Sequence, residues 1–175
     1  MDYRDYLNYA EKYLLLAETE AEQEKDVTWL LTPATILAWA AIEAFVNNML
    51  EDFGSLPEDM FDLHERAFLL EKRLVFLDTG ERAGQFDLVG SEYRGIADKV
   101  LFLLAKFGTR AGQQIKGTGL WQNFQELKRV RDALMHPSRS KEVPLDVVRT
   151  RGFIETAQEV IRMISQHVWG HKVQF

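Results

Sequence analysis

The chain of 175 residues contains no cysteine and only four prolines and four histidines. The absence of cysteine excludes disulfides, thiolate catalysis and cysteine-ligated zinc. The histidines form no pair of the HExxH type, and no glycine-rich loop has the spacing of a P-loop or of a dinucleotide-binding turn. We therefore expect neither a metal site nor a cofactor.

Signals for secretion or membrane insertion are also missing. Residues 1–5 hold no basic region followed by an apolar core, so we predict no signal peptide. The longest apolar run, residues 34–49, is interrupted by Glu43 and is shorter than the roughly 20 residues that a membrane span needs. We expect a soluble, cytoplasmic protein without a membrane association.

What the sequence does contain is a helical pattern along nearly its whole length, which predicts a single domain over residues 1–175. The predicted class is all-α, a compact up-and-down bundle of about five to six helices. We expect Thr32 to be an N-cap with Pro33 at the first helical position, and Ser91 to be a second N-cap. Gly54 is expected to end its helix in the left-handed conformation. The expected helices are 3–25, 33–53, 57–78 with a break near Asp62, 91–107, 120–135 and 145–168. Residues 80–90 and 108–119 are expected to be loops, and no segment is expected to be a strand.

Two pairs of residues match a short Arg…His pattern, Arg131…His136 and Arg162…His167. As text the pattern is weak, because a chain with twelve arginines and four histidines produces on the order of one match by chance. Arg162 falls on the polar face of its helix, opposite an apolar stripe, so we interpret it as a solvated side chain. The two matches therefore have to be separated by their context.

Arg131 stands where the apolar stripe of its helix requires an apolar residue. The stripe is Leu120, Phe124, Leu127, position 131 and Leu134. Because an unpaired buried charge is very costly, Arg131 must have a partner, line a cavity or face another subunit. Glu43, which interrupts the most apolar helix, is the natural buried partner. The pattern leaves a structural ion pair and a functional site as equal alternatives.

His136 precedes Pro137, and the residue before a proline avoids helical geometry, so the helix is expected to end there. The free carbonyl groups at that end favour a protonated imidazole. Asp132 lies one turn earlier and is expected to orient the imidazole through a hydrogen bond. Five residues of regular helix place Arg131 and His136 about 140° apart, so their convergence is expected to require a second copy of the chain.

At this point the chain resembles the HEPN superfamily (higher eukaryotes and prokaryotes nucleotide-binding), compact α-helical domains that carry an Arg followed four to six residues later by His. Three segments carry the resemblance in order: AAIEAFVN at residues 40–47, LEKRL at residues 70–74 and FQELKRVRDALMHP at residues 124–137. The last segment is the specific one, and the resemblance covers residues 36–137.

The resemblance implies a metal-independent endoribonuclease of the toxin or antiviral-defence type, acting as a homodimer in which the two Arg/His motifs meet. His136 would then be the general acid or base, Arg131 would stabilise the phosphorane, Asp132 would orient His136, and Glu43 would support Arg131. The residues expected to hold the RNA backbone are Lys128, Arg129, Arg139 and Lys141. An antitoxin or a regulatory protein is a further expected partner. The alternative is an inactive HEPN-like interaction or nucleotide-binding module.

Overall fold

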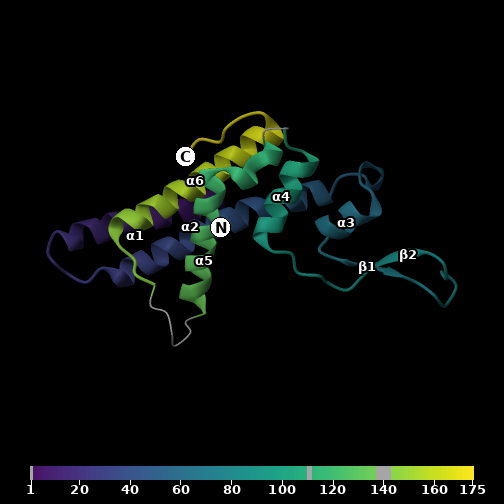
Figure 1. The fold of residues 1–175 in the computed structure, drawn as a ribbon, viewed down its shortest axis with the longest axis horizontal. Coiled ribbons are helices and arrows are strands. Elements are labelled where there is room, and N and C mark those ends of the chain that lie inside the picture. Colours follow the sequence, from purple (N-terminus) through teal and green to yellow (C-terminus); the bar gives the residue numbers. More distant parts are fainter. Residues whose placement is uncertain (1, 110–111, 137–142) are drawn as a thin grey trace. The chain divides into compact units, whose positions relative to one another are not determined.

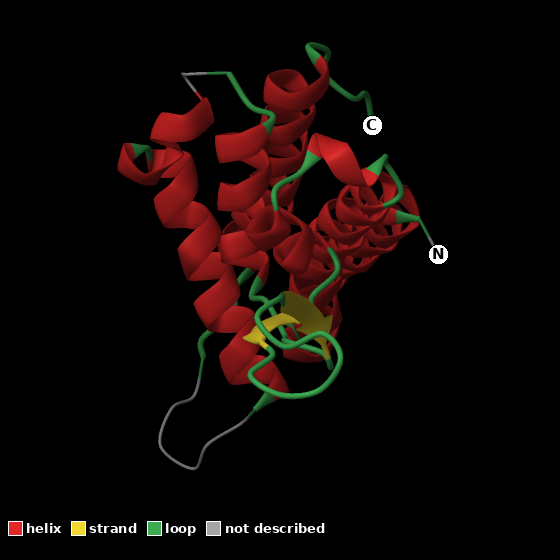
Figure 2. Ribbon diagram, turned by 90° about the vertical axis from the view of Figure 1, so that its right-hand side faces the viewer, coloured by secondary structure: helices red, strands yellow, loops and turns green. Residues whose placement is uncertain are grey.

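The computed structural model of the chain describes residues 2–109, 112–136 and 143–175. Within these ranges the chain forms six α-helices, two short 3-10 helices and one pair of strands (Figures 1 and 2). The elements are α1 (Tyr3–Ala21), α2 (Thr28–Gly54), η1 (Glu58–Met60), α3 (Leu63–Leu69), β1 (Arg73–Phe76), β2 (Phe86–Val89), α4 (Ile96–Lys106), η2 (Gly112–Gly117), α5 (Gly119–Met135) and α6 (Val147–Trp169). The predicted helical class is confirmed, with a small β-hairpin in addition.

The ends of α5 and α6 follow signals that the sequence carries locally. Thr118 caps α5, because its hydroxyl accepts a hydrogen bond from the backbone N–H of Trp121 at 3.2 Å. Asp146 caps α6 in the same way, with the N–H of Arg149 at 2.7 Å from its carboxylate. A side chain that satisfies a free N–H group fixes the start of a helix, and both helices lie close to their predicted ranges.

Helix α2 departs from the prediction at both ends. It begins at Thr28 rather than at Pro33, because the Asp26 carboxylate accepts the N–H of Thr28 at 2.9 Å and so caps an earlier turn. Thr32 is not a cap, since its hydroxyl donates to the carbonyl of Thr28 at 3.0 Å. Pro33 lies inside the helix, where its missing N–H costs one hydrogen bond. Gly54 closes α2 without taking the predicted left-handed conformation.

Residues 57–89 hold the largest error of the prediction. The expected break at Asp62 is present, and Asp62 caps α3 by accepting the N–H of Glu65 at 2.8 Å. The helix then ends at Leu69, and Glu71 takes a left-handed φ of 49° that no regular helix contains. Strand β1 lies in the range predicted to be helix, and it pairs antiparallel with β2, which lies in the range predicted to be a loop. Short apolar strands cannot be told from buried helix by periodicity alone, which explains the error.

Three smaller differences concern the start of α4, the loop that follows it and the end of α1. The helix begins at Ile96 rather than at Ser91, so Ser91 is not its cap. The predicted loop 108–119 contains the short helix η2. Helix α1 ends at Ala21, a turn before its predicted end at Lys25. None of these differences changes the predicted order of the helices.

The chain separates into two compact units, which we call the helical unit (Met1–Phe45 with Leu101–Phe175) and the acidic unit (Val46–Val100). The acidic unit has six Lys and Arg against twelve Asp and Glu, so it carries a net charge of −6. The helical unit has fifteen of each and is neutral. The net charge of the whole chain therefore belongs to the acidic unit. The single-domain organisation stays a prediction.

In the helical unit, α6 packs against both α1 and α5. Helices α1 and α6 run antiparallel (Figure 1): Glu18 contacts Arg151, whereas Glu11, about two turns earlier on α1, contacts Gln158, about two turns later on α6. The N-terminal part of α2 adds Trp39, whose ring stacks on Phe124 of α5 with centroids 5.3 Å apart. Both of these aromatic side chains are almost fully buried. They join α2 to α5 next to the predicted site.

In the acidic unit, α3 packs against β1, and the hairpin places Phe76 opposite Phe86. Their ring centroids are 5.3 Å apart, and each side chain remains about half exposed at 54%. Alternation along the strands puts Leu74 and Leu88 on the same face as these rings. This face of the hairpin is therefore apolar.

Among the described residues one helix, α2, is long and apolar enough to cross a membrane, with a mean hydropathy of 1.6 over its most apolar window. The early start at Thr28 gives it this length. Slightly more than half of the window, 56%, is buried inside the protein, as expected of a core helix. The location of the protein in the cell stays a prediction.

Candidate functional site at the end of helix α5

The buried face of α5 is formed by Phe124, Leu127 and Val130. Val130, rather than Arg131, occupies the core position, so the predicted stripe is wrong by one residue at this point. Arg131 lies at the edge of the core, with 24% of its side chain exposed. A guanidinium at this border keeps contact with water, which lowers the cost of its burial.

Three groups hold the guanidinium of Arg131. One terminal nitrogen donates to Glu43 Oε1 of α2 at 2.7 Å, and the other donates to Asp132 Oδ1 at 2.9 Å. The guanidinium carbon also lies 5.6 Å from the ring centroid of Trp39, within the range of a cation–π contact. The structure thus gives Arg131 the partner that the sequence suggested, Glu43, and a second carboxylate beside it.

The Asp132 carboxylate is occupied by cations on its own helix. Its Oδ2 accepts a hydrogen bond from Lys128 Nζ at 2.7 Å, and its Oδ1 accepts the one from Arg131. Burial raises the pKa of the Asp132 carboxyl, but the hydrogen bonds and charges of Lys128 and Arg131 outweigh it and hold that pKa below its ordinary value. The contacts of the described residues include no hydrogen bond from the imidazole of His136 to the Asp132 carboxylate, although each of its oxygens can accept a second one.

His136 is the residue at which α5 ends. Its φ of −126° and ψ of 67° are not helical, and its backbone N–H donates to the carbonyl of Asp132 at 3.0 Å. The side chain is exposed. The predicted end of the helix before Pro137 is therefore confirmed, and the imidazole is open to a ligand at the surface. Arg139 and Lys141, two of the predicted RNA-binding residues, lie outside the described residues.

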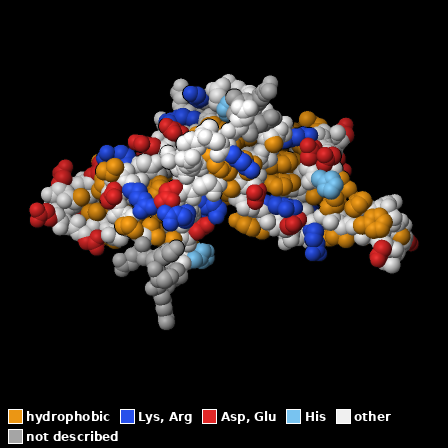
Figure 3. Space-filling model, in the orientation of Figure 1, with side chains coloured by type: hydrophobic (Ala, Val, Ile, Leu, Met, Phe, Trp, Pro, Cys, Tyr) orange, Lys and Arg blue, Asp and Glu red, His pale blue; other side chains and the backbone are white. Residues whose placement is uncertain are grey.

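The two remaining predicted RNA-binding residues, Lys128 and Arg129, both have carboxylate partners. Arg129 forms two hydrogen bonds with Glu126, at 2.8 and 2.7 Å, and Glu126 also accepts one from Arg149 of α6 at 2.6 Å. The hydrogen bond from Arg129 is the main cause that lowers the pKa of Glu126. On the face shown in Figure 3, Lys and Arg side chains over α5 have Asp and Glu side chains beside them. The charges of this part of the helix are largely balanced within the chain.

The second match to the pattern has different surroundings. The Arg162 guanidinium lies 4.7 Å from the ring centroid of Phe175, and His167 Nδ1 is 2.5 Å from the hydroxyl of Thr109. These contacts involve no carboxylate that holds the arginine. The context thus separates Arg131 from Arg162, as the sequence analysis required.

Sequence reasoning missed another cation, Lys99 of α4. Among the described residues it is the one charged residue that is buried, with 5% of the residue exposed. Its position after Asp98 in a short amphipathic helix carries no local signal of burial, so only its distant partners could have identified it. Within the described ranges, no group of three or more His, Asp or Glu side chains is placed to hold a metal ion.

No protein-family model, curated protein or solved structure matches the chain.

Proposed function

We propose that the chain is a HEPN-like, metal-independent endoribonuclease that acts as a homodimer, with its active site at the end of α5. The observation that carries the proposal is the fixed position of Arg131, held by Glu43, Asp132 and Trp39, on the helix that ends at the exposed His136. A charged side chain held in one orientation at the border of the core, together with an open histidine that a second copy can bring to it, is the arrangement that acid–base chemistry on a phosphodiester needs.

The reaction follows from these two side chains. His136 of one copy removes the proton from the ribose 2′-hydroxyl, and the resulting oxygen forms a bond to phosphorus. The bond from phosphorus to the 5′-oxygen then breaks, and His136 of the second copy protonates the leaving oxygen. The products are a 2′,3′-cyclic phosphate and a 5′-hydroxyl. The Arg131 guanidinium has five N–H donors, and those not used by Glu43 and Asp132 are available to the phosphorane.

The homodimer belongs to the proposal because of helix geometry. Five residues of α5 separate Arg131 from His136, which corresponds to about 140° around the helix axis. A two-fold axis at the end of α5 would bring the arginine of one copy to the histidine of the other. A cytoplasmic location and an antitoxin or regulatory protein as partner are parts of the same proposal.

A second candidate function is favoured by the charge balance around Arg131. Two carboxylates face this one guanidinium, and Lys128 and Arg129 are paired as well. A dianionic phosphorane would have to compete with these carboxylates. This observation supports a HEPN-like interaction module without catalytic activity, in which the Arg131–Glu43 pair orders an interface.

The test is cleavage of RNA in the presence of EDTA by the wild type and by His136→Ala. We expect His136→Ala to lower the cleavage rate by about 10²–10⁴-fold, the usual contribution of a proton-transfer group, and Arg131→Gln by about 10²–10³-fold. The matched control is His167→Ala, which removes the histidine of the other Arg…His match and should leave the rate unchanged. The cleaved ends are to be identified as 2′,3′-cyclic phosphates by mass spectrometry.

Two results would contradict the ribonuclease. Equal cleavage by the wild type and His136→Ala would trace the activity to a contaminant. Absence of cleavage by a wild type whose circular dichroism shows folded helix would favour the interaction module.

A further inference from the structure

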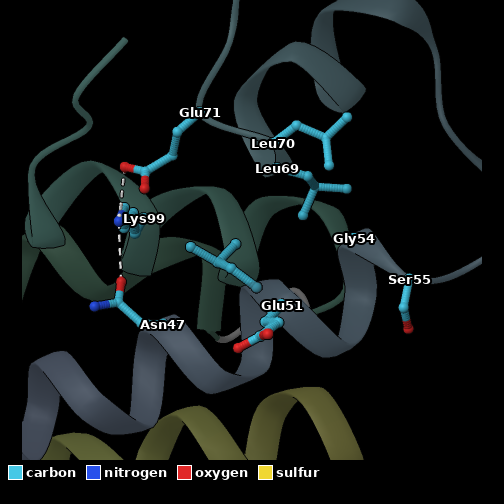
Figure 4. A pocket seen from close by; sticks show the side chains of 9 residues that line it. Asn47, Glu51, Gly54, Ser55, Leu69, Leu70, Glu71 and Lys99 are labelled. Atoms are coloured by element: carbon cyan, nitrogen blue, oxygen red, sulfur yellow. Dashed lines mark hydrogen bonds and ion pairs between the residues drawn. The ribbon is translucent and has the colours of Figure 1, made fainter. Parts of the chain in front are cut away.

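The acidic unit contains an amphipathic cavity of about 470 Å³. It is surrounded by the C-terminal half of α2, by the end of α3 and Glu71 shortly after it in the sequence, and by Lys99 of α4 (Figure 4). Its apolar wall is made of Leu50, Leu69 and Leu70. A concave site with an apolar wall and a few polar groups is the usual form of a small-molecule site. The cavity lies wholly within residues 46–100, whereas the proposed ribonuclease site lies in the helical unit.

One side of the cavity is a closed polar cluster. Lys99 Nζ is 2.8 Å from Glu71 Oε1 and donates to Asn47 Oδ1 at 2.9 Å, as Figure 4 shows. Only 6% of the Lys99 side chain is exposed. Glu71 is held further by the backbone N–H of Arg94 at 3.2 Å. The charges of Lys99 and Glu71 therefore balance each other, and this cluster forms a fixed wall.

The remaining charge of the cavity belongs to Glu51 of α2. Its side chain is exposed, and the described residues give it no hydrogen bond or ion pair. Figure 4 places it between the Lys99 cluster and Gly54 with Ser55. The lining thus has one carboxylate in excess, inside a unit whose net charge is −6. A field of this sign attracts cations and repels anions.

We propose that this cavity binds an organic cation, an ammonium or guanidinium group on a short apolar stem. The cation lies against Glu51, and the stem lies against the three leucines. An anion is opposed by Glu51 and by the acidic unit as a whole, and a purely polar cation leaves the leucines uncovered. The same chemistry is offered by a free alkylamine and by a lysine side chain of a partner protein.

The test is a titration of the full chain with hexylammonium, in which binding is monitored through the backbone amide NMR signals. We expect saturable shifts confined to residues around 47–55, 69–71 and 99, with a Kd of about 1 mM, as is reasonable for so small a ligand. Hexan-1-ol and hexanoate have the same stem with no charge and with the opposite charge, and both should bind more weakly. Tighter binding by hexanoate, or shifts spread over the helical unit, would overturn the proposal.

A matched pair of variants assigns the charge. Glu51→Gln and Asp52→Asn remove the same charge from neighbouring exposed residues of α2, but only Glu51 lines the cavity. We expect Glu51→Gln to weaken hexylammonium binding about three- to tenfold, as for a partly screened charged hydrogen bond. Asp52→Asn should change the Kd less than about twofold at physiological salt. Equal effects of the two variants would show that hexylammonium binds to a non-specific acidic surface rather than to the cavity.

A third variant tests the apolar part. Gly54 has a φ that other residues adopt, and a Cβ there would lie 3.7 Å from Leu70 Cδ2, at ordinary contact distance. Gly54→Leu is therefore expected to fold and to fill the cavity, abolishing the saturable shifts. Undiminished binding by this folded variant would contradict the site. A blocked peptide with one lysine between leucines is compared with the same peptide carrying norleucine in place of the lysine, and with hexylammonium. Tighter binding of the lysine peptide than of both others identifies the side chain of a partner protein, rather than a free amine, as the ligand.

Discussion

The two units shield a cation in different ways. In the helical unit, Arg131 keeps 24% of its side chain exposed and faces two carboxylates, Glu43 and Asp132. In the acidic unit, Lys99 keeps only 6% exposed and faces one carboxylate and one amide, Glu71 and Asn47. Arg131 therefore retains access to a ligand at the surface, whereas Lys99 is part of a wall.

The difference also shows where chemistry is available in each unit. Arginine presents a planar set of five donors, so two carboxylates fix its orientation without using all of them. Lysine has three donors, and two acceptors leave little for a ligand at a buried site. In the acidic unit the group left for recognition is the exposed Glu51 rather than the buried cation. The neutral helical unit and the acidic unit are thus suited to ligands of opposite charge.

The largest expected effect that tests this comparison follows from removing Lys99, the more deeply buried of the two cations. Lys99→Met removes the partner of Glu71, which is itself 39% exposed. Breaking a buried pair by removing one partner costs about 3–5 kcal/mol, and the exposure of Glu71 reduces our expectation to about 2–3 kcal/mol. Urea unfolding measures this change. Lys72→Met, at an exposed position, should change the free energy of unfolding by less than about 0.5 kcal/mol, and a similar loss in both variants would contradict the assigned role of Lys99.

A smaller effect is expected at Arg131, because both of its carboxylates can recover water when it is removed. Arg131→Met should cost about 1–2 kcal/mol of unfolding free energy. The double variant Arg131→Met with Glu43→Leu should recover much of that loss, because neither charge is then left without its partner. Arg129→Met, whose side chain is 67% exposed, should cost no more than about 0.5 kcal/mol. Strict additivity of the Arg131 and Glu43 variants would show that the pair is not coupled.

The smallest expected effect is a dependence of stability on acid pH. Burial raises the pKa of Glu71, but the hydrogen bonds from Lys99 and the Arg94 N–H and the nearby charges outweigh it, so the pKa lies below its ordinary value in the folded chain. The stabilisation that this gives is present above the ordinary pKa and is lost as the pH falls through the lowered one. We expect the free energy of unfolding to fall from about pH 5 downward, and to fall less steeply in Glu71→Gln. The same dependence of unfolding free energy on pH in both proteins would show that Glu71 does not contribute to the acid sensitivity.

Sequence reasoning succeeded where a local signal determines the outcome. The proline after His136 ends α5 at the predicted residue, and the apolar periodicity places the starts of α5 and α6 within two residues of the observed ones, although the caps that fix these starts, Thr118 and Asp146, were not among the predicted caps. It failed where local signals compete, as at Glu71, whose left-handed φ ends a helical pattern and allows β1 to pair with a strand ten residues further on. It also failed by one residue at Val130, which lies in the core while Arg131 lies at its edge, because which of two adjacent residues faces the core depends on the helices packed around α5.

The sequence by itself determined a mostly helical chain, the end of α5 at His136 and the separation of Arg131 from the other Arg…His match. Only the tertiary structure decided which carboxylates hold Arg131, that Lys99 is buried, and that Glu51 is the charge left over beside an apolar wall. The physical reason is the separation along the sequence over which each kind of interaction acts. Capping and periodicity act within one or two turns, whereas Arg131 and Glu43 are 88 residues apart and Lys99 and Asn47 are 52 apart. Such pairs form only after the apolar faces have packed and fixed which cations remain shielded from water.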